Sequence, residues 1–245
     1  MIKQQRWSII LNLCEEKDEV DVSEFVLALK VSEATVRRDL QQMEDLDMIT
    51  RYHGGAKINK LRNSEQPMIF KSETNSDSKR KVARLAASLI EDNQMIFIDA
   101  GSSTYEMINY ITAKNITVVT TGIPHIQSLG LNSIRTIILG GSVRWSTQAI
   151  TGNQALSQLN NLFFDKAFLG VNGIHQLHGF TTTNEQEAEI KSKIMSQSTD
   201  TYFLADHSKF NKLFPVKYAD LKDGTILTDT ITDFDSSTVL FKIAK

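Results

Sequence analysis

The apolar positions of the first sixty residues recur at the spacing of short amphipathic helices. Val36, Leu40 and Met43 fall at i, i+4 and i+7, so they line one face of a helix predicted over residues 33–46. Similar spacings predict two shorter helices before it, over residues 6–14 and 22–29. Because only a short turn separates the last two helices, this order predicts a helix-turn-helix.

Capping residues mark where the last two of these helices begin. Ser32 precedes the third helix, where its hydroxyl can accept a hydrogen bond from a backbone N–H, and the charge of Glu33 suits the positive end of the helix dipole. Asp21 precedes the second helix and Glu24 follows three residues later, which is the D-x-x-E form of a capping box. The pattern therefore predicts side-chain caps at both helices.

The third helix leaves polar and basic side chains away from its apolar stripe. These are Thr35, Arg37, Arg38 and Gln41. After it, Ile49, Arg51 and His53 alternate ahead of a glycine pair, which predicts a small basic β-ribbon, the wing of a winged helix. An amphipathic helix with two exposed arginines is, by itself, most often only a solvated surface. The order of capped helices, short turn and basic ribbon instead favours contact with DNA.

The predicted DNA-contacting residues come from the start of the third helix, its two arginines and the ribbon. They are Ser32, Glu33, Ala34, Thr35, Arg37, Arg38, Arg51 and His53. The second helix of a helix-turn-helix lies in the major groove, and the first helix braces it. We expect the basic side chains of the ribbon to reach the phosphate backbone or a minor groove.

Composition and charge restrict the class of protein. The formal net charge of the 245-residue chain is −2, and residues 1–60 hold nine Lys or Arg against eleven Asp or Glu, so a basic surface for DNA must be local. The single cysteine, Cys14, excludes a disulfide framework within one chain and favours a reducing compartment. The first twenty residues resemble neither a signal peptide nor a membrane span, so we expect a cytoplasmic protein.

The hydrophobic pattern changes after a polar stretch that contains Pro67. Residues 58–79 lack sustained periodicity, so they are predicted as a linker between a DNA-binding domain at 1–57 and a larger domain at 80–245. In the larger domain, short apolar runs predict seven strands, at 95–98, 116–119, 137–139, 167–171, 202–205, 225–227 and 239–241. Helical patterns lie between several of them, which predicts a mostly parallel α/β sheet with ligands at the carboxyl ends of its strands.

The connection after the first of these strands, D-A-G-S-S-T, is rich in groups that bind small ligands. Its residues of interest are Asp99, Gly101, Ser102, Ser103 and Thr104. The glycine lets the backbone approach a ligand, and the three hydroxyls beside the N–H groups of a helix start suit phosphate oxygens. The aspartate could hold a sugar hydroxyl. An ordinary strand-to-helix turn is the alternative, and the stretch matches neither a P-loop nor a dinucleotide fingerprint, so no cofactor is predicted.

Other predicted strand ends carry residues that could share the same cleft. Gly141 follows the third strand, and Lys209, which follows the fifth, is either a cationic partner of a bound phosphate or a solvated loop lysine. Glu187 and Lys191 lie four apart on the helix predicted over residues 185–195, so they are either effector-binding residues or a surface pair.

Metal chemistry has weaker support than phosphate binding. His175 and His178 are three residues apart, but they lack a nearby cysteine or a clear carboxylate partner. A solvated pair is therefore favoured over a zinc site, and His125, at a predicted helix start after Pro124, receives the same interpretation. No metal site is predicted.

Several motifs resemble those of one known family. VSEATVRRDL and RYHGGA resemble the DNA-binding domain of DeoR-family transcription regulators. DAGSST, ILGG, FDKAFLGVNG, GFTTT, EAEIK and ADHSKF resemble the effector domain of the same family, so the likeness covers nearly the whole chain. The resemblance implies a winged helix-turn-helix, operator recognition by a homo-oligomer (a dimer or tetramer), and usually repression. It also implies a domain similar in fold to ribose-5-phosphate isomerase that binds phosphorylated sugars.

Three positions depart from the common pattern of that family. Thr121 stands where asparagine is common, Asn153 where proline is frequent, and Asn211 where glycine is frequent. The D-A-G-S-S-T loop is intact. The change at position 121 removes an amide that could read a sugar hydroxyl, so it bears on the identity of the effector.

Two functions from different classes fit these residues. The favoured one is a DNA-binding repressor of a sugar-metabolism operon that responds to a phosphorylated sugar; the alternative is a sugar-phosphate isomerase fused to a DNA-binding domain. Isomerisation needs a carboxylate base and a polar group for the enediolate oxygen. The residue types are present at Asp165, Glu187, Asp206 and Lys209. Because the chain lacks a D-G-A-D-E-like carboxylate cluster, we expect binding without turnover and no enzyme.

Overall fold

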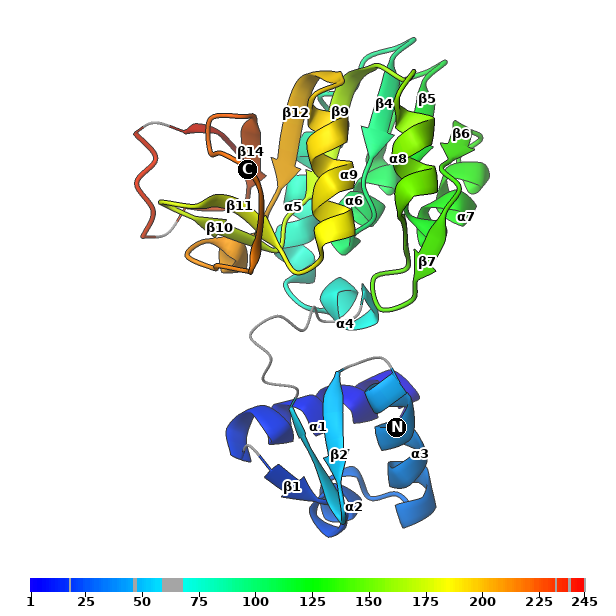
Figure 1. The fold of residues 1–245 in the computed structure, drawn as a ribbon, viewed down its shortest axis with the longest axis vertical. Helices are drawn as coiled ribbons and strands as arrows, with labels where there is room; N and C mark the ends of the chain where they lie inside the picture. The colour runs from blue at the N-terminus through cyan, green and yellow to red at the C-terminus, as the bar shows by residue number, and fades with distance from the viewer. Residues whose placement is uncertain (18, 46–47, 59–67, 232, 238, 245) are drawn as a thin grey trace. The chain divides into compact units, whose positions relative to one another are not determined.

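The structure of the protein is a computed structural model. The described residues are 1–245 apart from 18, 46–47, 59–67, 232, 238 and 245. They form two compact units, Met1–Lys71 and Ser72–Lys245, and each is described by itself (Figure 1). The predicted linker, 58–79, lies partly outside the described residues. Its described part holds helix α4 (Met68–Glu73) and the start of helix α5 (Ser76–Ala87), so regular structure begins before residue 80.

The N-terminal unit has three helices and a small antiparallel sheet. Its elements are α1 (Lys3–Lys17), β1 (Glu19–Asp21), α2 (Val22–Leu29), α3 (Glu33–Asp45), β2 (Ile49–Tyr52) and β3 (Gly55–Ile58). The strands pair in the order β1-β3-β2. Strands β2 and β3 form the predicted ribbon, with His53 and Gly54 in its turn. The predicted helix-turn-helix and its wing are confirmed, and β1 is an additional strand.

The predicted apolar stripe of α3 faces the core of this unit. Val36, Leu40 and Met43 are all 0–1 % exposed. The same cluster includes Trp7, Ile10, Cys14, Phe25 and Leu29 from α1 and α2. The spacing of the apolar positions therefore predicted correctly which face of α3 is buried and which face is exposed.

One of the two predicted caps is present. The Ser32 hydroxyl accepts a hydrogen bond of 3.3 Å from the backbone N–H of Thr35 at the start of α3. Asp21 precedes α2 but makes no side-chain cap bond. Its carboxylate accepts a hydrogen bond of 3.2 Å from the Tyr52 hydroxyl, and Glu24 pairs with the last lysine of α1. The cap predicted from the Asp21 side chain is therefore wrong, whereas the Glu24 carboxylate does interact with the backbone N–H of Asp21, which is the other half of the predicted box.

The C-terminal unit is built on a seven-stranded sheet. In pairing order its strands are β15 (Leu240–Ile243), β14 (Thr225–Thr228), β12 (Ser198–Leu204), β9 (Phe164–Gly170), β4 (Met95–Ile98), β5 (Thr117–Thr120) and β6 (Arg135–Ile138). All of these pairings are parallel. Each strand overlaps one of the seven predicted strands, so the predicted fold class, a winged helix-turn-helix followed by a mostly parallel α/β domain, is confirmed.

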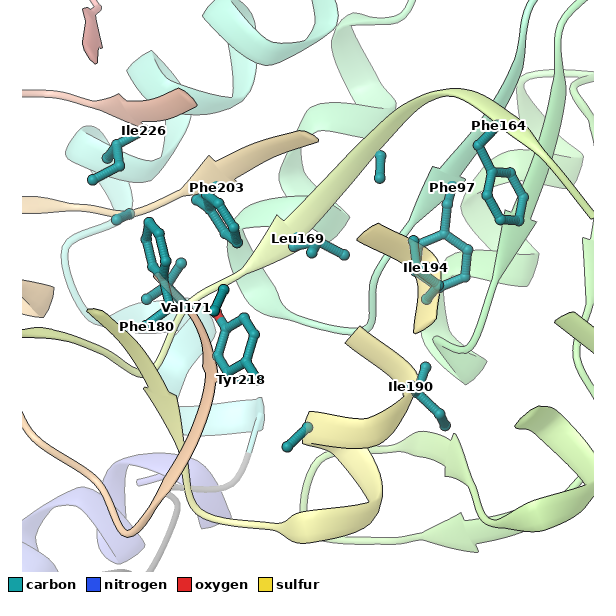
Figure 2. Packing of buried hydrophobic residues seen from close by; sticks show 14 of the residues in the cluster. Phe97, Phe164, Leu169, Val171, Phe180, Ile190, Ile194, Phe203, Tyr218 and Ile226 are labelled. Carbon is teal, nitrogen blue, oxygen red and sulfur yellow. The ribbon is translucent and has the colours of Figure 1, made fainter. Parts of the chain in front are cut away.

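Alternation along the strands divides the apolar side chains between two cores, one on each face of the sheet. Phe97 and Phe203 belong to the core that α9 (Glu185–Met195) covers. Ile190 and Ile194 of this helix lie in the same core (Figure 2). The neighbours of Phe97 along β4 enter the other core, together with residues of α5. A sheet covered on both faces leaves only its strand ends open to a ligand.

Shorter elements complete the C-terminal unit. They are α6 (Ser102–Met107), η1 (Ile108–Tyr110), α7 (Ile123–Leu131), β7 (Ser142–Arg144), β8 (Ala149–Thr151), α8 (Asn153–Leu159), β10 (Gly173–His175), β11 (Gly179–Thr182), η2 (His207–Lys209) and β13 (Val216–Ala219). Strands β7 and β8 form a hairpin, and β10, β11 and β13 form a second small sheet; neither was predicted. Among the described residues, every helix is too short or too polar to cross a membrane.

Candidate functional site

The outward face of α3 carries two arginines in different surroundings. The guanidinium of Arg37 donates a hydrogen bond of 2.8 Å from Nε to Oε1 of Glu33, and its Nη2 lies 2.7 Å from the same oxygen in an ion pair. Arg38 is exposed and has no hydrogen-bond or ion-pair partner among the described residues. At the N-terminus of the same helix, the hydroxyls of Ser32 and Thr35 lie 2.9 Å apart. The predicted α3 residues therefore share one polar surface, on which Glu33 orients Arg37.

The two basic residues of the ribbon, like the two arginines of α3, have different surroundings. Arg51 is partly covered, because its guanidinium donates to Gln41 of α3 and lies 3.8 Å from a carboxylate oxygen of Glu44. The backbone N–H of Arg51 donates a further bond of 2.9 Å to Glu44. His53 is exposed in the turn, beside Gly54 with its φ of 105°. Arg51 thus joins the ribbon to α3, whereas His53 points to solvent.

An ion pair between the buried Asp39 and the partly buried Arg6, which the sequence did not predict, holds the inner side of α3. Asp39 is 3 % exposed, and its two oxygens accept bonds from Arg6 of α1, at 2.6 Å from Nε and 3.1 Å from Nη2. The sequence contained one signal for this contact. Asp39 lies between Val36 and Leu40 on the buried side of the helix, where a carboxylate requires a partner.

The second candidate site centres on Asp99, at the carboxyl end of β4. Asp99 is 5 % exposed, and its Oδ2 accepts a hydrogen bond of 3.0 Å from the backbone N–H of Gly170 at the end of β9. The same oxygen forms an ion pair with Lys191, which also donates a bond of 2.9 Å to the Gly170 carbonyl. Lys191 is 4 % exposed. The structure thus joins three segments that are far apart in sequence into one buried charged cluster.

The hydroxyls of the predicted phosphate loop divide into two groups. The Thr104 hydroxyl lies 2.6 Å from the carbonyl of Asp99 and 2.9 Å from that of Gly101, so it holds the turn closed. It is therefore not available to a phosphate. The hydroxyls of Ser102 and Ser103 have no hydrogen-bond partner among the described residues. The backbone N–H groups of the first turn of α6 lie beside them and have no partner within the helix.

His125, which sequence reasoning set aside, supports this loop from inside. It is 0 % exposed, and its Nε2 lies 3.3 Å from the Thr104 hydroxyl. Because the hydroxyl has one hydrogen and two carbonyl acceptors, we assign Nε2 as the donor to Thr104. Nδ1 is buried without a partner among the described residues. Burial lowers the pKa of His125 to about 4, so the ring is neutral at pH 7.

Glu187 and Gly141 have surroundings different from those of the Asp99 cluster. Glu187 accepts bonds of 3.0 Å from Arg144 and 2.9 Å from Thr147, which tie α9 to the β7–β8 hairpin. The predicted alternative, a surface pair of Glu187 with Lys191, is wrong, because Lys191 turns inward to Asp99. Gly141 has a structural requirement of its own, since a Cβ there would lie 2.5 Å from the carbonyl of Thr151.

The connection after β12 carries Asp206 and Lys209. Asp206 is 1 % exposed, and its Oδ1 accepts bonds from the Asn75 carboxamide at 2.9 Å and from the backbone N–H of Ser208 at 3.0 Å. Lys209 is half-buried at the end of η2. Asp206 follows a strand that pairs with β9, so it shares the carboxyl edge of the sheet with Asp99.

The carboxylate proposed for isomerase chemistry at residue 165 lies elsewhere. Asp165 is the second residue of β9 and accepts a bond of 2.8 Å from the backbone N–H of Met95, at the amino end of β4. Asp99 and Asp206 lie at the opposite, carboxyl end of these parallel strands. Asp165 therefore cannot act with them on one small substrate.

Two open cavities of the C-terminal unit also lie away from the predicted residues. Their volumes are about 670 Å³ and 410 Å³, and they lie at the amino ends of β5 and β6 and of β9 and β12. Among the described residues, no group of three or more His, Cys, Asp or Glu side chains has the spacing of a metal site. The rings of His175 and His178 stack on each other, with centroids 4.8 Å apart.

Comparison with known proteins finds a family match in each of the two units. A family model of the DeoR-like helix-turn-helix domain matches residues 6–62, and one of the DeoR C terminal sensor domain matches residues 74–233. The HTH-type transcriptional regulator FruR of Bacillus subtilis is 38 % identical, over 100 % of both chains. The lactose phosphotransferase system repressor of Streptococcus mutans is 31 % identical, over 100 % of this chain and 98 % of that one.

Among solved structures, the ribose 5-phosphate isomerase of Methanocaldococcus jannaschii is similar to 56 % of this chain and 55 % of its own. The identity is 17 % and the TM-score is 0.40. The two family models together match most of the sequence, one in each unit. The chain belongs to the DeoR family of helix-turn-helix transcriptional regulators.

Proposed function

We propose that this protein is a sequence-specific, operator-binding repressor of a sugar-metabolism operon, and that a phosphorylated sugar controls it. The observation that carries the DNA-binding part is the outward face of α3, where Glu33 orients Arg37 and Arg38 is exposed and unpaired among the described residues. Arginine can bond bidentately to guanine in the major groove, and an unpaired guanidinium can also neutralise a phosphate. A homo-oligomer would place two α3 helices in successive major grooves.

The effector part rests on the carboxyl edge of the large sheet. The loop after β4 offers two serine hydroxyls and the N–H groups at the start of α6, which suit phosphate oxygens, while Asp99 and Lys191 supply charge beside it. Lys209 adds a second candidate cation. The name of the lactose phosphotransferase system repressor supports sugar metabolism as the regulated process.

The protein acts by binding and not by turnover in this proposal. A sugar-phosphate isomerase needs its base and its enediolate partner within reach of the same carbons. Asp165 lies at the other end of the strands, and Glu187 is committed to Arg144 and Thr147. Steady conversion of ribose 5-phosphate by the purified protein, lost in the Glu187→Ala variant, would contradict this.

DNA binding is tested with operator fragments that the wild-type protein selects from a random pool. Arg37→Ala and Arg38→Ala should each weaken binding by roughly 1–3 kcal/mol. A loss confined to certain base pairs identifies base reading, and a uniform loss identifies a phosphate contact. Arg80→Ala, which removes an exposed arginine of the C-terminal unit, is the matched control. If both α3 variants bind as the control does, α3 is not the DNA-contacting helix.

The effector is tested with a panel of phosphorylated sugars and inorganic phosphate. A ligand of the folded protein raises its melting temperature by mass action and changes its operator affinity if the two sites are coupled. If no sugar phosphate changes either quantity, and Lys209→Ala responds as wild type does, the sensor part of the proposal fails.

A further inference from the structure

The segment that leads into the sensor fold is held by hydrogen bonds that include those of Thr74 and Asn75. Asn75 lies between α4 and α5 in the left-handed conformation, with φ 53° and ψ 37°, and its side chain makes no helix-cap bond. Its carboxamide donates instead to Asp206 Oδ1 at 2.9 Å. One residue earlier, the carbonyl of Thr74 accepts a bond of 2.8 Å from Lys79, which is 4 % exposed. This junction is therefore tied to the body of the C-terminal unit by side chains.

The carboxylate that holds Asn75 uses its two oxygens unequally. Oδ1 of Asp206 accepts three donors, one from Asn75 and two, the backbone N–H and the hydroxyl, from Ser208. Oδ2 is buried and has no partner among the described residues. An ionised carboxylate accepts about four hydrogen bonds, and a buried acceptor that lacks a donor is costly. Oδ2 of Asp206 is thus a buried oxygen that can accept a further hydrogen bond.

Asp206 is placed where the proposed effector would extend. Leu204 of β12 pairs with Gly170 of β9, and the N–H of Gly170 donates to Asp99. Because Asp99 and Asp206 follow strands separated only by β9, both lie at the carboxyl edge of the sheet, about two inter-strand spacings apart across the strands. A sugar phosphate with its phosphate at Ser102 and Ser103 would extend along this edge toward Asp206.

We infer that Asp206 reads a hydroxyl of the effector and that this contact releases Asn75. The inference rests on the proposed function. Two of the donors on Oδ1 come from Ser208 in the same turn, and they stay with the carboxylate when it rotates toward a ligand. The bond from Asn75 crosses to another element, so it is the one exchanged. The ligand class is a phosphorylated sugar whose free hydroxyl donates to a carboxylate.

Release at Asn75 has a direct route to the DNA-binding unit along the chain. The match to the sensor family begins at residue 74, and α4 is the segment that precedes it. A bond that is made in one state and lost in the other gives the effector different affinities for the two states, as coupling requires. In the bonded state, the Asn75 carboxamide donates to Asp206. In the released state, which the effector stabilises, this hydrogen bond is broken.

The test uses a substitution that removes the side chain without straining the backbone. Asn75→Gly keeps the left-handed conformation, which glycine adopts freely. Asn115→Gly is the matched control, since Asn115 also has a positive φ, of 57°, and lies at the amino end of β5. Operator affinity of the full chain is measured for both variants and for wild type, with and without fructose 1-phosphate, glucose 6-phosphate and ribose 5-phosphate.

Asn75→Gly should shift operator affinity without effector by roughly fivefold or more, in the direction that an active sugar phosphate shifts wild type. The remaining response to that sugar phosphate should be small, and Asn115→Gly should behave as wild type. Wild-type affinity and a full response in Asn75→Gly would overturn the inference. If no sugar phosphate acts on wild type, the proposed effector class fails; the effector-free comparison still decides whether the Asn75–Asp206 bond controls DNA binding.

Asp206→Asn separates hydroxyl reading from a purely structural role. The melting temperature is measured with the same sugar phosphates and with inorganic phosphate, which has no sugar hydroxyl. The variant should lose the shift caused by an active sugar phosphate and keep the shift caused by inorganic phosphate. Equal retention of both shifts, or equal loss of both, would overturn the assignment of Asp206 as the hydroxyl reader.

Discussion

The two candidate sites use charged side chains in opposite surroundings. On α3, Arg37 and its partner Glu33 are 52 % and 59 % exposed, so water already screens their attraction. In the C-terminal unit, the side chains of Lys191 and Asp99 are 5 % and 7 % exposed. The first pair presents donors to a partner that approaches from solvent. The second pair has already lost its water and depends on its own partners.

The difference follows from the size of the two proposed ligands. A DNA duplex offers a long row of phosphates that exposed side chains can reach, whereas a small effector has to be surrounded by groups placed for it. In the N-terminal unit, the residues proposed to contact DNA differ from those that hold α3, since the largely buried Arg6–Asp39 pair holds the helix and the exposed arginines face outward. In the C-terminal unit, the two residues proposed to act at the effector site, Asp99 and Lys191, are also the ones that pair in the interior.

Removing one partner of the buried pair should break the C-terminal site most severely. Asp99→Ala leaves the buried ammonium of Lys191 beside the Gly170 carbonyl but without its carboxylate partner, which should cost roughly 3–5 kcal/mol of unfolding free energy. Hydrogen exchange of the amides in β4 and β9 measures the loss. Lys193→Ala, on the same helix, should stay within about 0.5 kcal/mol of wild type. A cost for Asp99→Ala no larger than that of Lys193→Ala would contradict the comparison.

The pH dependence of stability should provide a second test of how the interior of the C-terminal unit treats charge. His125 has a folded pKa of about 4 against an ordinary value of 6.5, because burial disfavours the charged ring. Above pH 6.5 the ring is neutral in both states and contributes nothing. As the pH falls from 6.5 to 4, only the unfolded chain binds the proton, so stability is lost, by roughly 3 kcal/mol at pH 4.

His125→Gln should remove this part of the pH dependence, and the control His178→Gln, at an exposed position, should retain it. Urea denaturation at a series of pH values between 6.5 and 4 measures the slope. A slope that is the same in wild type and in His125→Gln would mean that the imidazole beside Thr104 is not buried in its neutral form.

The backbone of both units could be predicted from sequence because its signals are local. Buried parallel strands read as short apolar runs, which located all seven strands of the large sheet, and the stripe of Val36, Leu40 and Met43 located the buried face of α3. The small sheets were missed because β7, β8 and β10 have only three residues each. At that length, no periodicity can be read.

The partners of the charged residues could not be predicted, because they come from distant segments. Lys191 lies 92 positions from Asp99, and Asp39 lies 33 positions from Arg6. Local spacing instead paired Lys191 with Glu187, its neighbour on the helix. The loop at Asp99 was therefore found, but the interior support that His125, Lys191 and Asp206 give to this edge was not. The roles of these residues in effector binding stay predictions.

The smallest expected effect distinguishes two helix starts in the N-terminal unit. Ser32 caps α3 through its hydroxyl, so Ser32→Ala should cost about 1 kcal/mol. Asp21→Ala should cost less, because Asp21 makes no cap bond and its contact with Tyr52 is exposed. Hydrogen exchange of the amides in α2 and α3 compares the two. Equal costs would show that the capping pattern in the sequence, rather than the observed bonds, sets the stability of these helices. The side-chain cap rejected at Asp21 would then have to be accepted.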